Sequence, residues 1–450
     1  MTIHTFFVIF PLLVIHNPDT IPTFFIYNKI NLLYNNILEK TYSTTEKSMQ
    51  QKNKREKWIK TRHKIITAVL KPVIGTYTKL KFGVDVQKFK EQGDRQYLVV
   101  MNHQTSFDQF FIAMAFDGPI YYIATEDIFS LGWLSKLLVW AVAPIPIKKQ
   151  TTDLKAVKTC LRVAKEGGTI ALAPEGNRTY SGRTVYIKPS IAKLAKTLRL
   201  PVAVFRIEEG YGIQPRWSDA VRKGRMKAYV SRVIEPEEYK ALSDDEFFAV
   251  LEKELYVDEN CLSGKFEHKN LAEYMERCIY VCPDCGFSKF ESRGNTAHCT
   301  SCGKEVRFMP TKEIVGINCD FPFRFFGNWY DYQSDFVNST DVTKLTGKPI
   351  FTDTANLSEV ILYDKKHPIK ENVHIELYGD RVVIGDILTC RFDDTATITV
   401  LGKNKANIYY NDKVYQLKGD KRFNALKYVQ IYNRYKNIKE GNEDGKFLGL

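Results

Sequence analysis

The sequence lacks an apolar run long enough to cross a bilayer, and it also lacks the marks of a cleaved secretory signal. The N-terminal apolar run covers only residues 6–15 and contains a proline, whereas a spanning helix needs about 20 residues. The first basic residue, Lys29, follows this run instead of preceding it, and no small-residue cleavage site is present. We expect Met49 to be the true start, which makes residues 1–48 a spurious extension. The alternative is that residues 1–48 form a weak hydrophobic anchor.

Cysteine is scarce, with 9 in 450 residues, which argues against a disulfide framework. Four of the nine form two Cys-x-x-Cys-Gly pairs, and these are Cys282 with Cys285 and Cys299 with Cys302. Four thiolates at this spacing are typical of a structural zinc site, so residues 278–306 are predicted to form a zinc ribbon, with an exchangeable redox pair as the alternative. Cys278 and His298 lie nearby, but a four-ligand site does not need them.

Acidic residues are almost absent from residues 51–81, which contain ten basic residues and one acidic residue. The whole chain has a net charge of +13, from 65 basic and 52 acidic residues, so most of the surplus lies in this short arm. A basic arm favours an anionic partner such as an acidic membrane surface. The predicted ribbon is nearly neutral, because Lys289 and Arg293 are balanced by Asp284 and Glu291. We therefore expect no nucleic-acid partner.

Residues 57–77 have the apolar periodicity of an amphipathic helix, and we expect Pro72 to kink or split it. Two interpretations remain open for its apolar stripe. The stripe packs on the core of the domain, or it lies on an anionic bilayer with Trp58 buried in the interface. With the charges that precede it, this helix forms a basic amphipathic arm over residues 49–81.

Residues 82–260 alternate short apolar runs with helical segments, which is typical of an α/β domain. The predicted strands are residues 97–101, 120–123, 169–173 and 202–205, and the predicted helices are residues 107–116, 131–141, 153–166 and 190–198. The fold class is therefore α/β, a mixed sheet with flanking helices.

The first chemical motif lies where a predicted buried strand passes into a helix, over residues 101–111. His103 and Asp108 are five residues apart, which would separate them on one helix but lets them meet across a turn. An aspartate bonded to one imidazole nitrogen leaves the other free to act as a general base. Thr105 or Ser106 is expected to cap the helix. The closeness of Ser106 to His103 also keeps a Ser-His hydrolase open as a minor option.

The second motif, Pro174-Glu175-Gly176-Asn177-Arg178, also follows a predicted buried strand. Glycine lets backbone N–H groups approach a ligand closely, and arginine binds phosphate through two parallel hydrogen bonds. Taken alone, this segment could be an ordinary turn.

In this order and spacing, the two motifs resemble those of the glycerolipid acyltransferase family typified by 1-acylglycerol-3-phosphate acyltransferase. His103 to Asp108 is similar to the family's H-x4-D motif. Residues 174–178 are similar to its P-E-G-T-R motif, with Asn177 where threonine is usual. Residues 200–204 resemble its later apolar strand. Residues 143–148 resemble a block that ends in a phosphate-contacting arginine, here Lys148, while residues 125–128 match the K-x-E-L stretch poorly.

The resemblance implies roles for these residues. His103 would act as the general base and Asp108 would orient it, while Glu175, Gly176, Arg178 and Lys148 would line the acceptor-phosphate end. It implies direct acyl transfer, without an acyl-enzyme, from acyl-CoA or an acyl-carrier protein to a lysophospholipid. The acceptor would be 1-acylglycerol-3-phosphate, which yields phosphatidic acid in phospholipid biosynthesis. We expect the protein to lie peripherally on the cytoplasmic face of the cell membrane.

Residues 311–450 are β-rich, with short alternating strands predicted at residues 373–378, 397–401 and 414–417 and a final helix. This order loosely resembles a pleckstrin-homology-like barrel. Two rival functions remain for the whole chain. One is a catalytically inactive lipid-binding scaffold, and the other is a zinc-ribbon nucleic-acid binder.

Overall fold

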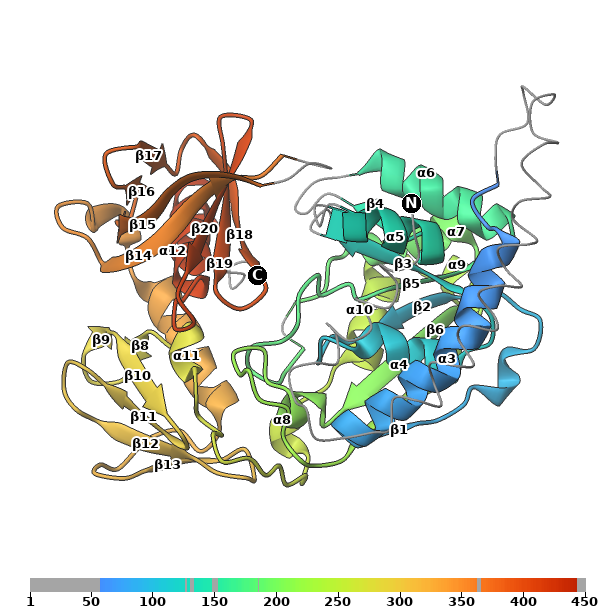
Figure 1. Cartoon of the computed structure of the whole chain (residues 1–450), viewed down its shortest axis with the longest axis horizontal. Coiled ribbons are helices and arrows are strands. Elements are labelled where there is room, and N and C mark those ends of the chain that lie inside the picture. Colours follow the sequence, from blue (N-terminus) through green and yellow to red (C-terminus); the bar gives the residue numbers. More distant parts are fainter. Residues whose placement is uncertain are drawn as a thin grey trace. The chain divides into compact units, whose positions relative to one another are not determined.

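The structure is a computed structural model, and it describes residues 57–125, 128–129, 133–147, 153–184, 186–361 and 366–442. The elements below belong to one unit that begins at Trp58 (Figure 1). The N-terminal apolar run, most of the basic arm and Lys148 lie outside the described residues.

A mixed seven-stranded sheet forms the centre of the α/β part, in the order β1-β7-β6-β2-β5-β3-β4. Only β6 and β7 pair antiparallel, and the other neighbours are parallel. The strands are β1 (Val84–Val86), β2 (Leu98–Met101), β3 (Ile120–Thr125), β4 (Ile145–Ile147), β5 (Thr169–Leu172), β6 (Val202–Glu208) and β7 (Met226–Ile234). All four strands predicted from the sequence are confirmed, and the mixed α/β class is correct.

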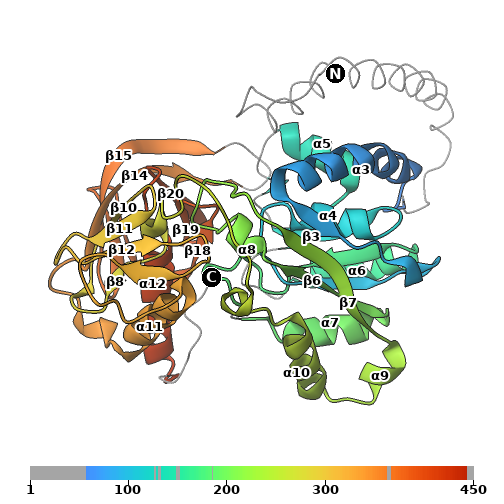
Figure 2. The same ribbon diagram turned by 90° about the horizontal axis from the view of Figure 1, so that it is seen from below.

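Helices cover both faces of this sheet (Figure 2). The helices of the α/β part are α3 (Thr61–Phe82), α4 (Asp108–Ala115), α5 (Trp133–Val142), α6 (Leu154–Lys165), α7 (Ser190–Leu198), α9 (Pro236–Lys240) and α10 (Asp244–Leu255), together with the short α8 (Gly210–Ile213) that follows β6. Successive β2 side chains point to opposite faces. Val99 packs in a cluster with α3 and α4, while Leu98 and Val100 pack with α6, α7 and α10. Burial on both faces explains why the strand is an unbroken apolar run.

The predicted amphipathic helix is α3, which continues through Pro72 without a break. Trp58 does not lie free at its start, because its ring packs on the core and its Nε1 donates to Ala143 O at 3.2 Å. This contact favours the interpretation in which the apolar side chains pack on the core of the domain, and binding of the arm to a bilayer stays a prediction. Ile65 and Leu80, by contrast, are exposed on α3.

The cysteine module contains two small antiparallel sheets. One pairs β8 (Val281–Cys282) with β9 (Gly286–Phe287), and the other has the order β10-β11-β12-β13. These four strands are β10 (Phe290–Arg293), β11 (Thr296–Cys299), β12 (Glu305–Phe308) and β13 (Ile314–Gly316). Gly286 and Gly303, the residues after each Cys-x-x-Cys pair, have φ of +70° and +73°. Glycine is the residue that adopts this left-handed backbone without strain.

The C-terminal part is an antiparallel seven-stranded sheet in the order β17-β16-β15-β14-β20-β19-β18, which confirms its β-rich character. The strands are β14 (Phe351–Glu359), β15 (His367–Leu377), β16 (Arg381–Ile384), β17 (Leu388–Arg391), β18 (Thr395–Leu401), β19 (Lys405–Tyr410) and β20 (Lys413–Gly419). The expected final helix is α12 (Leu426–Lys439). The likeness to a pleckstrin-homology barrel stays a prediction.

The helix α11 (Phe326–Ser339) was not anticipated, because polar residues separate its apolar ones. Its buried face includes Trp329, Tyr330 and Val337, which recur at helical spacing. These side chains belong to a core that also contains Tyr180, Tyr211 and Trp217 of the α/β part. The ribbon, the C-terminal sheet and the α/β part therefore share buried apolar side chains.

Candidate active site

His103 lies in the loop between β2 and α4, and Asp108 is the first residue of α4. The Nδ1 atom of His103 is 2.8 Å from Oδ2 of Asp108. The Asp108 carboxylate is fully buried, whereas 23% of the His103 side chain is exposed. With Nδ1 held by the carboxylate, Nε2 is the nitrogen left to meet a substrate proton. This is the geometry of an oriented general base.

The turn between the two residues is built around the carboxylate and not around a helix cap. Asp108 accepts hydrogen bonds from Gln104 N at 2.7 Å, Thr105 N at 2.9 Å and Thr105 Oγ1 at 2.6 Å. The N-cap position belongs to Phe107, which has no capping side-chain bond. The expectation that Thr105 or Ser106 caps α4 is therefore wrong, because Asp108 reaches back and uses the Thr105 donors itself.

The two sequence motifs meet because β2 and β5 are parallel neighbours in the sheet. The carboxyl ends of such strands lie at one edge, where α/β proteins bind ligands. The second motif and the residue that follows it hold the His103 backbone from both sides. Its N–H donates to Glu175 Oε1 at 2.6 Å, and its carbonyl accepts from Thr179 N at 3.0 Å.

Glu175 is buried, and its contact is with the His103 backbone. Burial raises the pKa of Glu175 to about 8, opposed by the His103 N–H and reinforced by the negative charge of Asp108. Gly176 is exposed, with a φ of +72° and no heavy atom within 4 Å of a Cβ built there. The structure therefore gives Glu175 a positioning contact and leaves the backbone at Gly176 open to a ligand.

Arg178 directs a guanidinium nitrogen into the interior. Its Nη1 is buried and has no hydrogen-bond partner among the described residues. Burial, and then the neighbouring charge of Arg216, lower the pKa of Arg178 to about 10, while the charge of Asp108 opposes them. An unpartnered buried guanidinium nitrogen is costly unless an anion meets it. Lys148 lies outside the described residues, so its expected place beside Arg178 stays a prediction.

Ser106 does not have the contacts of an activated nucleophile. Its Oγ donates to Gln214 Oε1 at 2.9 Å, and its backbone N–H donates to the same oxygen at 3.0 Å. An activated serine donates to its base, and the described contacts give Ser106 a different acceptor. This argues against the Ser-His hydrolase alternative.

Two residues of the site were not predicted from the sequence. Asn102 exchanges two hydrogen bonds of 2.8 Å with the backbone of Ile207, which ties the His103 loop to β6. Arg216 follows α8 and donates to Arg178 O at 3.0 Å. The position of Asn102 beside His103 could have drawn attention to it. No motif surrounds Arg216.

The four cysteines of the ribbon come together. The sulfur atoms of Cys282, Cys285, Cys299 and Cys302 all lie within 4.8 Å of one another. A tetrahedral zinc site with Zn–S bonds of about 2.3 Å places its sulfurs about 3.8 Å apart, and the Cys282 and Cys302 sulfurs are 3.7 Å apart. These four thiols therefore fit a zinc ion. The Cys278 thiol instead donates a hydrogen bond to Met275 O, and His298 is on the partly exposed side of β11.

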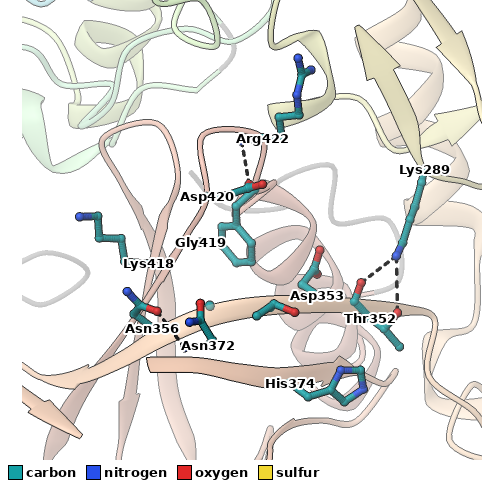
Figure 3. A pocket seen from close by; sticks show the side chains of 13 residues that line it. Lys289, Thr352, Asp353, Asn356, Asn372, His374, Lys418, Gly419, Asp420 and Arg422 are labelled. Carbon is teal, nitrogen blue, oxygen red and sulfur yellow. Dashed lines mark hydrogen bonds between the residues drawn. The ribbon is translucent and has the colours of Figure 1, made fainter. Parts of the chain in front are cut away.

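A cavity of about 810 Å³ lies elsewhere, against β14, β15 and β20 (Figure 3). Its lining includes Lys289, which donates to Thr352 O at 2.9 Å, and Asn356, whose Oδ1 accepts from Asn372 N at 2.9 Å. The lining contains no cysteine, and its one histidine, His374, is near Glu376 at 3.6 Å. None of the residues of the two motifs lines this cavity.

Comparisons with known proteins agree with the motifs. The Acyltransferase family model matches residues 83–208. The chain is 21% identical over 136 residues to a 1-acyl-sn-glycerol-3-phosphate acyltransferase of Bacillus subtilis (strain 168), which is 30% of this chain and 65% of that protein. The chain thus spans just under two thirds of the length of this relative.

A crystal structure of the 1-acyl-sn-glycerophosphate acyltransferase PlsC from Thermotoga maritima is also similar. It has a TM-score of 0.36 and 21% identity, and the match covers 43% of this chain and 80% of that one. Both motifs fall within the residues that the family model matches. Residues 83–208 are thus similar to acyltransferases, and the stretch that is similar includes both motifs.

Proposed function

We propose that the protein transfers an acyl group from an acyl thioester to the hydroxyl of a lysophospholipid. The acceptor is 1-acylglycerol-3-phosphate and the product is phosphatidic acid, which belongs to phospholipid biosynthesis. The observation that carries this proposal is the contact of 2.8 Å between His103 Nδ1 and the buried Asp108 carboxylate. An inactive scaffold has no need of a buried carboxylate that orients a partly exposed imidazole.

The reaction follows from the roles of these two side chains. His103 Nε2 takes the proton of the acceptor hydroxyl as its oxygen attacks the thioester carbonyl carbon. Asp108 stabilises the imidazolium that forms. The tetrahedral intermediate then collapses, the C–S bond breaks, and the thiolate leaves and recovers the proton from the imidazolium. One ester forms and one thiol is released, without an acyl-enzyme.

The donor is acyl-CoA or an acyl-carrier protein, and the acceptor phosphate is bound at the Arg178 end of the site. The unpartnered Nη1 of Arg178 supports this orientation, because arginine binds phosphate through charge-assisted hydrogen bonds. Because no side chain of the described residues fills the space beside Gly176, the glycerol backbone of the acceptor can lie next to it. Glu175 and the Thr179 N–H act through the His103 backbone.

A structural zinc ion bound by Cys282, Cys285, Cys299 and Cys302 is part of the proposal. The four sulfur atoms all lie within 4.8 Å of one another, which is close enough for one tetrahedral zinc ion to bind all four thiolates. The ion would hold the β8–β9 turn against the turn after β11 and take no part in acyl transfer.

We also propose that the protein binds the cytoplasmic face of the cell membrane peripherally. No helix in the described part of the chain is long and apolar enough to cross a membrane. The helices α3 and α5 instead carry exposed apolar side chains, and Arg62 of α3 donates to Trp140 O of α5 at 2.9 Å. Exposed on these two helices are Ile65, Leu80, Trp133, Val139 and Trp140. Apolar side chains beside basic ones are typical of surfaces that enter an anionic interface.

The direct test is an assay of the full-length protein with labelled acyl-CoA and acyl-carrier-protein donors against a panel of lysolipids. We expect phosphatidic acid from 1-acylglycerol-3-phosphate, and we expect Asp108→Asn to lower turnover. The matched control is Asp85→Asn, an exposed aspartate on β1. Absence of acyl transfer from either donor to every lysolipid, by a folded wild-type protein, would contradict the proposal.

A further inference from the structure

Positive side chains from outside residues 83–208 surround the loop that contains Arg178. The nearest is Arg216, which is only 3% exposed. Its Nη1 donates to Arg178 O at 3.0 Å, and its Nη2 donates to Asn177 Oδ1 at 3.2 Å. Its guanidinium lies 4.1 Å from the centre of the Tyr180 ring. Arg216 is therefore fixed in place by neutral groups alone.

Neither arginine has a carboxylate partner among the described residues. Arg178 and Arg216 appear in no ion pair there, and Nη1 of Arg178 has no hydrogen bond. Burial and then the charge of Arg216 lower the pKa of Arg178, and the charge of Asp108 opposes them. The Asp108 carboxylate, however, accepts its hydrogen bonds from Gln104 and Thr105. Buried like charges are costly unless an opposite charge joins them. The two arginines therefore lack a directly bonded anion in the part of the chain that the structure describes.

A third cation comes from the hairpin between β18 and β19. Lys403 Nζ donates to Ser218 O at 2.6 Å and to Asp219 Oδ1 at 2.7 Å. Arg277, from the segment before the ribbon, also binds Asp219, at 2.8 Å. Burial lowers the pKa of Lys403, Asp219 opposes this, and the charges of Arg178 and Arg277 lower it further. One carboxylate thus serves two cations, and this corner keeps a positive surplus.

We propose that Arg216 and Lys403 join Arg178 in one anion site, which makes the site selective for a phosphomonoester headgroup. A phosphomonoester carries a charge of about −1.5 to −2 at neutral pH, whereas a phosphodiester such as a choline lysolipid carries one negative charge on its phosphate. Three cations favour the more highly charged ligand. The inference rests on the proposed function only for the statement that the acceptor is a lipid. Binding of an anion at this site can be measured without acyl transfer.

The consequence concerns the C-terminal sheet. Lys403 belongs to that sheet, outside the matched acyltransferase domain, yet it contacts the Ser218–Asp219 segment that directly follows Arg216 and Trp217. The hairpin therefore supplies part of the acceptor site. In this proposal Arg216 and Lys403 determine which headgroup the site selects, and His103 is the residue that transfers the proton.

The test measures binding of glycerol 3-phosphate to the full-length protein from the shift that it produces in the thermal unfolding midpoint. Glycerophosphocholine, a phosphodiester, is the comparison ligand. We expect glycerol 3-phosphate to bind at least about tenfold more tightly than glycerophosphocholine to the wild type. Lost charge-assisted hydrogen bonds should weaken glycerol 3-phosphate binding by about 10- to 100-fold in Arg216→Gln, and by less in Arg216→Lys. Lys403→Gln should weaken it by a few-fold to about tenfold.

The matched control for Lys403 is Lys418→Gln, an exposed lysine on β20 of the same sheet. Asp85→Asn, at an exposed position on β1, should bind glycerol 3-phosphate like the wild type. If Arg216→Gln fails to fold, Arg216→Lys and Lys403→Gln decide the outcome. Equal affinity for the two ligands, or no effect of Arg216→Lys and Lys403→Gln, would overturn the inference even if the protein acylates lysolipids. Tight, Arg216-dependent binding without any acyl transfer would support it and reject the proposed function instead.

Discussion

The backbone N–H of His103 donates to the buried carboxylate of Glu175 at 2.6 Å, so the second motif holds the first in place. His103 is thus fixed twice, at its ring by Asp108 and at its backbone by Glu175. Two segments that lie about 70 residues apart in the sequence act as one unit, and substitutions in each have separable effects.

Replacing His103 with alanine should lower turnover by about 10²- to 10⁴-fold, the usual contribution of a positioned general base. The thermal midpoint should change little, because the His103 side chain is partly exposed and its backbone bonds remain. Single-turnover kinetics with a labelled acyl donor would measure this. His298→Ala, at a partly exposed histidine of β11, is the control. Turnover near the wild-type level in His103→Ala would reject the general-base role.

Glu175 should make stability depend on pH. Because burial raises its pKa to about 8, the folded protein holds a proton that the unfolded chain loses near its ordinary pKa. Stability from this group is present at low pH and is lost as pH rises from about 4.5 through 8. Glu175→Gln keeps an acceptor for His103 N and has no proton to lose. Its free energy of unfolding should fall less over this range, by about 1 kcal/mol or more. An unchanged pH profile, measured by urea unfolding at several pH values, would show that Glu175 does not titrate there.

Arg178→Ala should raise the KM for a phosphorylated lysolipid by about 10-fold or more, since a charge-assisted contact is lost. The KM for an uncharged monoacylglycerol should change much less. The comparison of the two acceptors in one variant serves as its own control. An equal rise for both acceptors would assign Arg178 a structural role.

Elemental analysis of the purified protein should give one equivalent of zinc, and a Cys282→Ser, Cys299→Ser double variant should contain none. Cys261→Ser, an exposed cysteine outside the cluster, is the control and should keep the metal. Removal of the ion with a chelator should lower the unfolding midpoint, because metal binding contributes to folding free energy. A wild type that is folded and free of metal would contradict the zinc proposal.

The exposed apolar side chains of α5 should contribute to membrane binding. Trp133 and Trp140 are 44% and 46% exposed, so the double substitution to serine should weaken binding to anionic vesicles by about tenfold or more. Ile369→Ser on β15, where the side chain is also exposed, is the control. Binding of the wild type should fall with salt and be weak on neutral vesicles. Unchanged sedimentation of the tryptophan variant would place the binding surface elsewhere.

The sequence predicts those elements that are buried on both sides. The runs at residues 98–101 and 202–205 are continuous apolar segments, since helices cover both faces of the sheet. The strand β7 was missed because exposed residues such as Lys227 and Arg232 interrupt its pattern. The helix α11 was missed for a similar reason. The apolar pattern of a segment therefore predicts its secondary structure only where the whole segment lies in one kind of environment, as a strand buried on both faces does.

The part of the site whose residues lie close together in the sequence could be predicted from it. The spacing of His103 and Asp108 is set by a single turn, and the sequence alone indicates that they can meet. The burial of Glu175 and Arg216 depends instead on packing between segments far apart in the chain. From the sequence alone, Arg216 would be predicted to be an ordinary surface arginine in a loop. The structure shows that its guanidinium packs on the ring of Tyr180.

The shared core has a consequence for synthesis. Tyr180, Tyr211 and Trp217 emerge from the ribosome long before the residues that cover them, among them Phe308, Phe326 and Tyr330. Domains usually fold in order as they are made, but here the first domain waits with aromatic side chains uncovered until the C-terminal half arrives. A chaperone that shields apolar surface should therefore act on the nascent chain during this interval, and a chain that stops near residue 260 should aggregate.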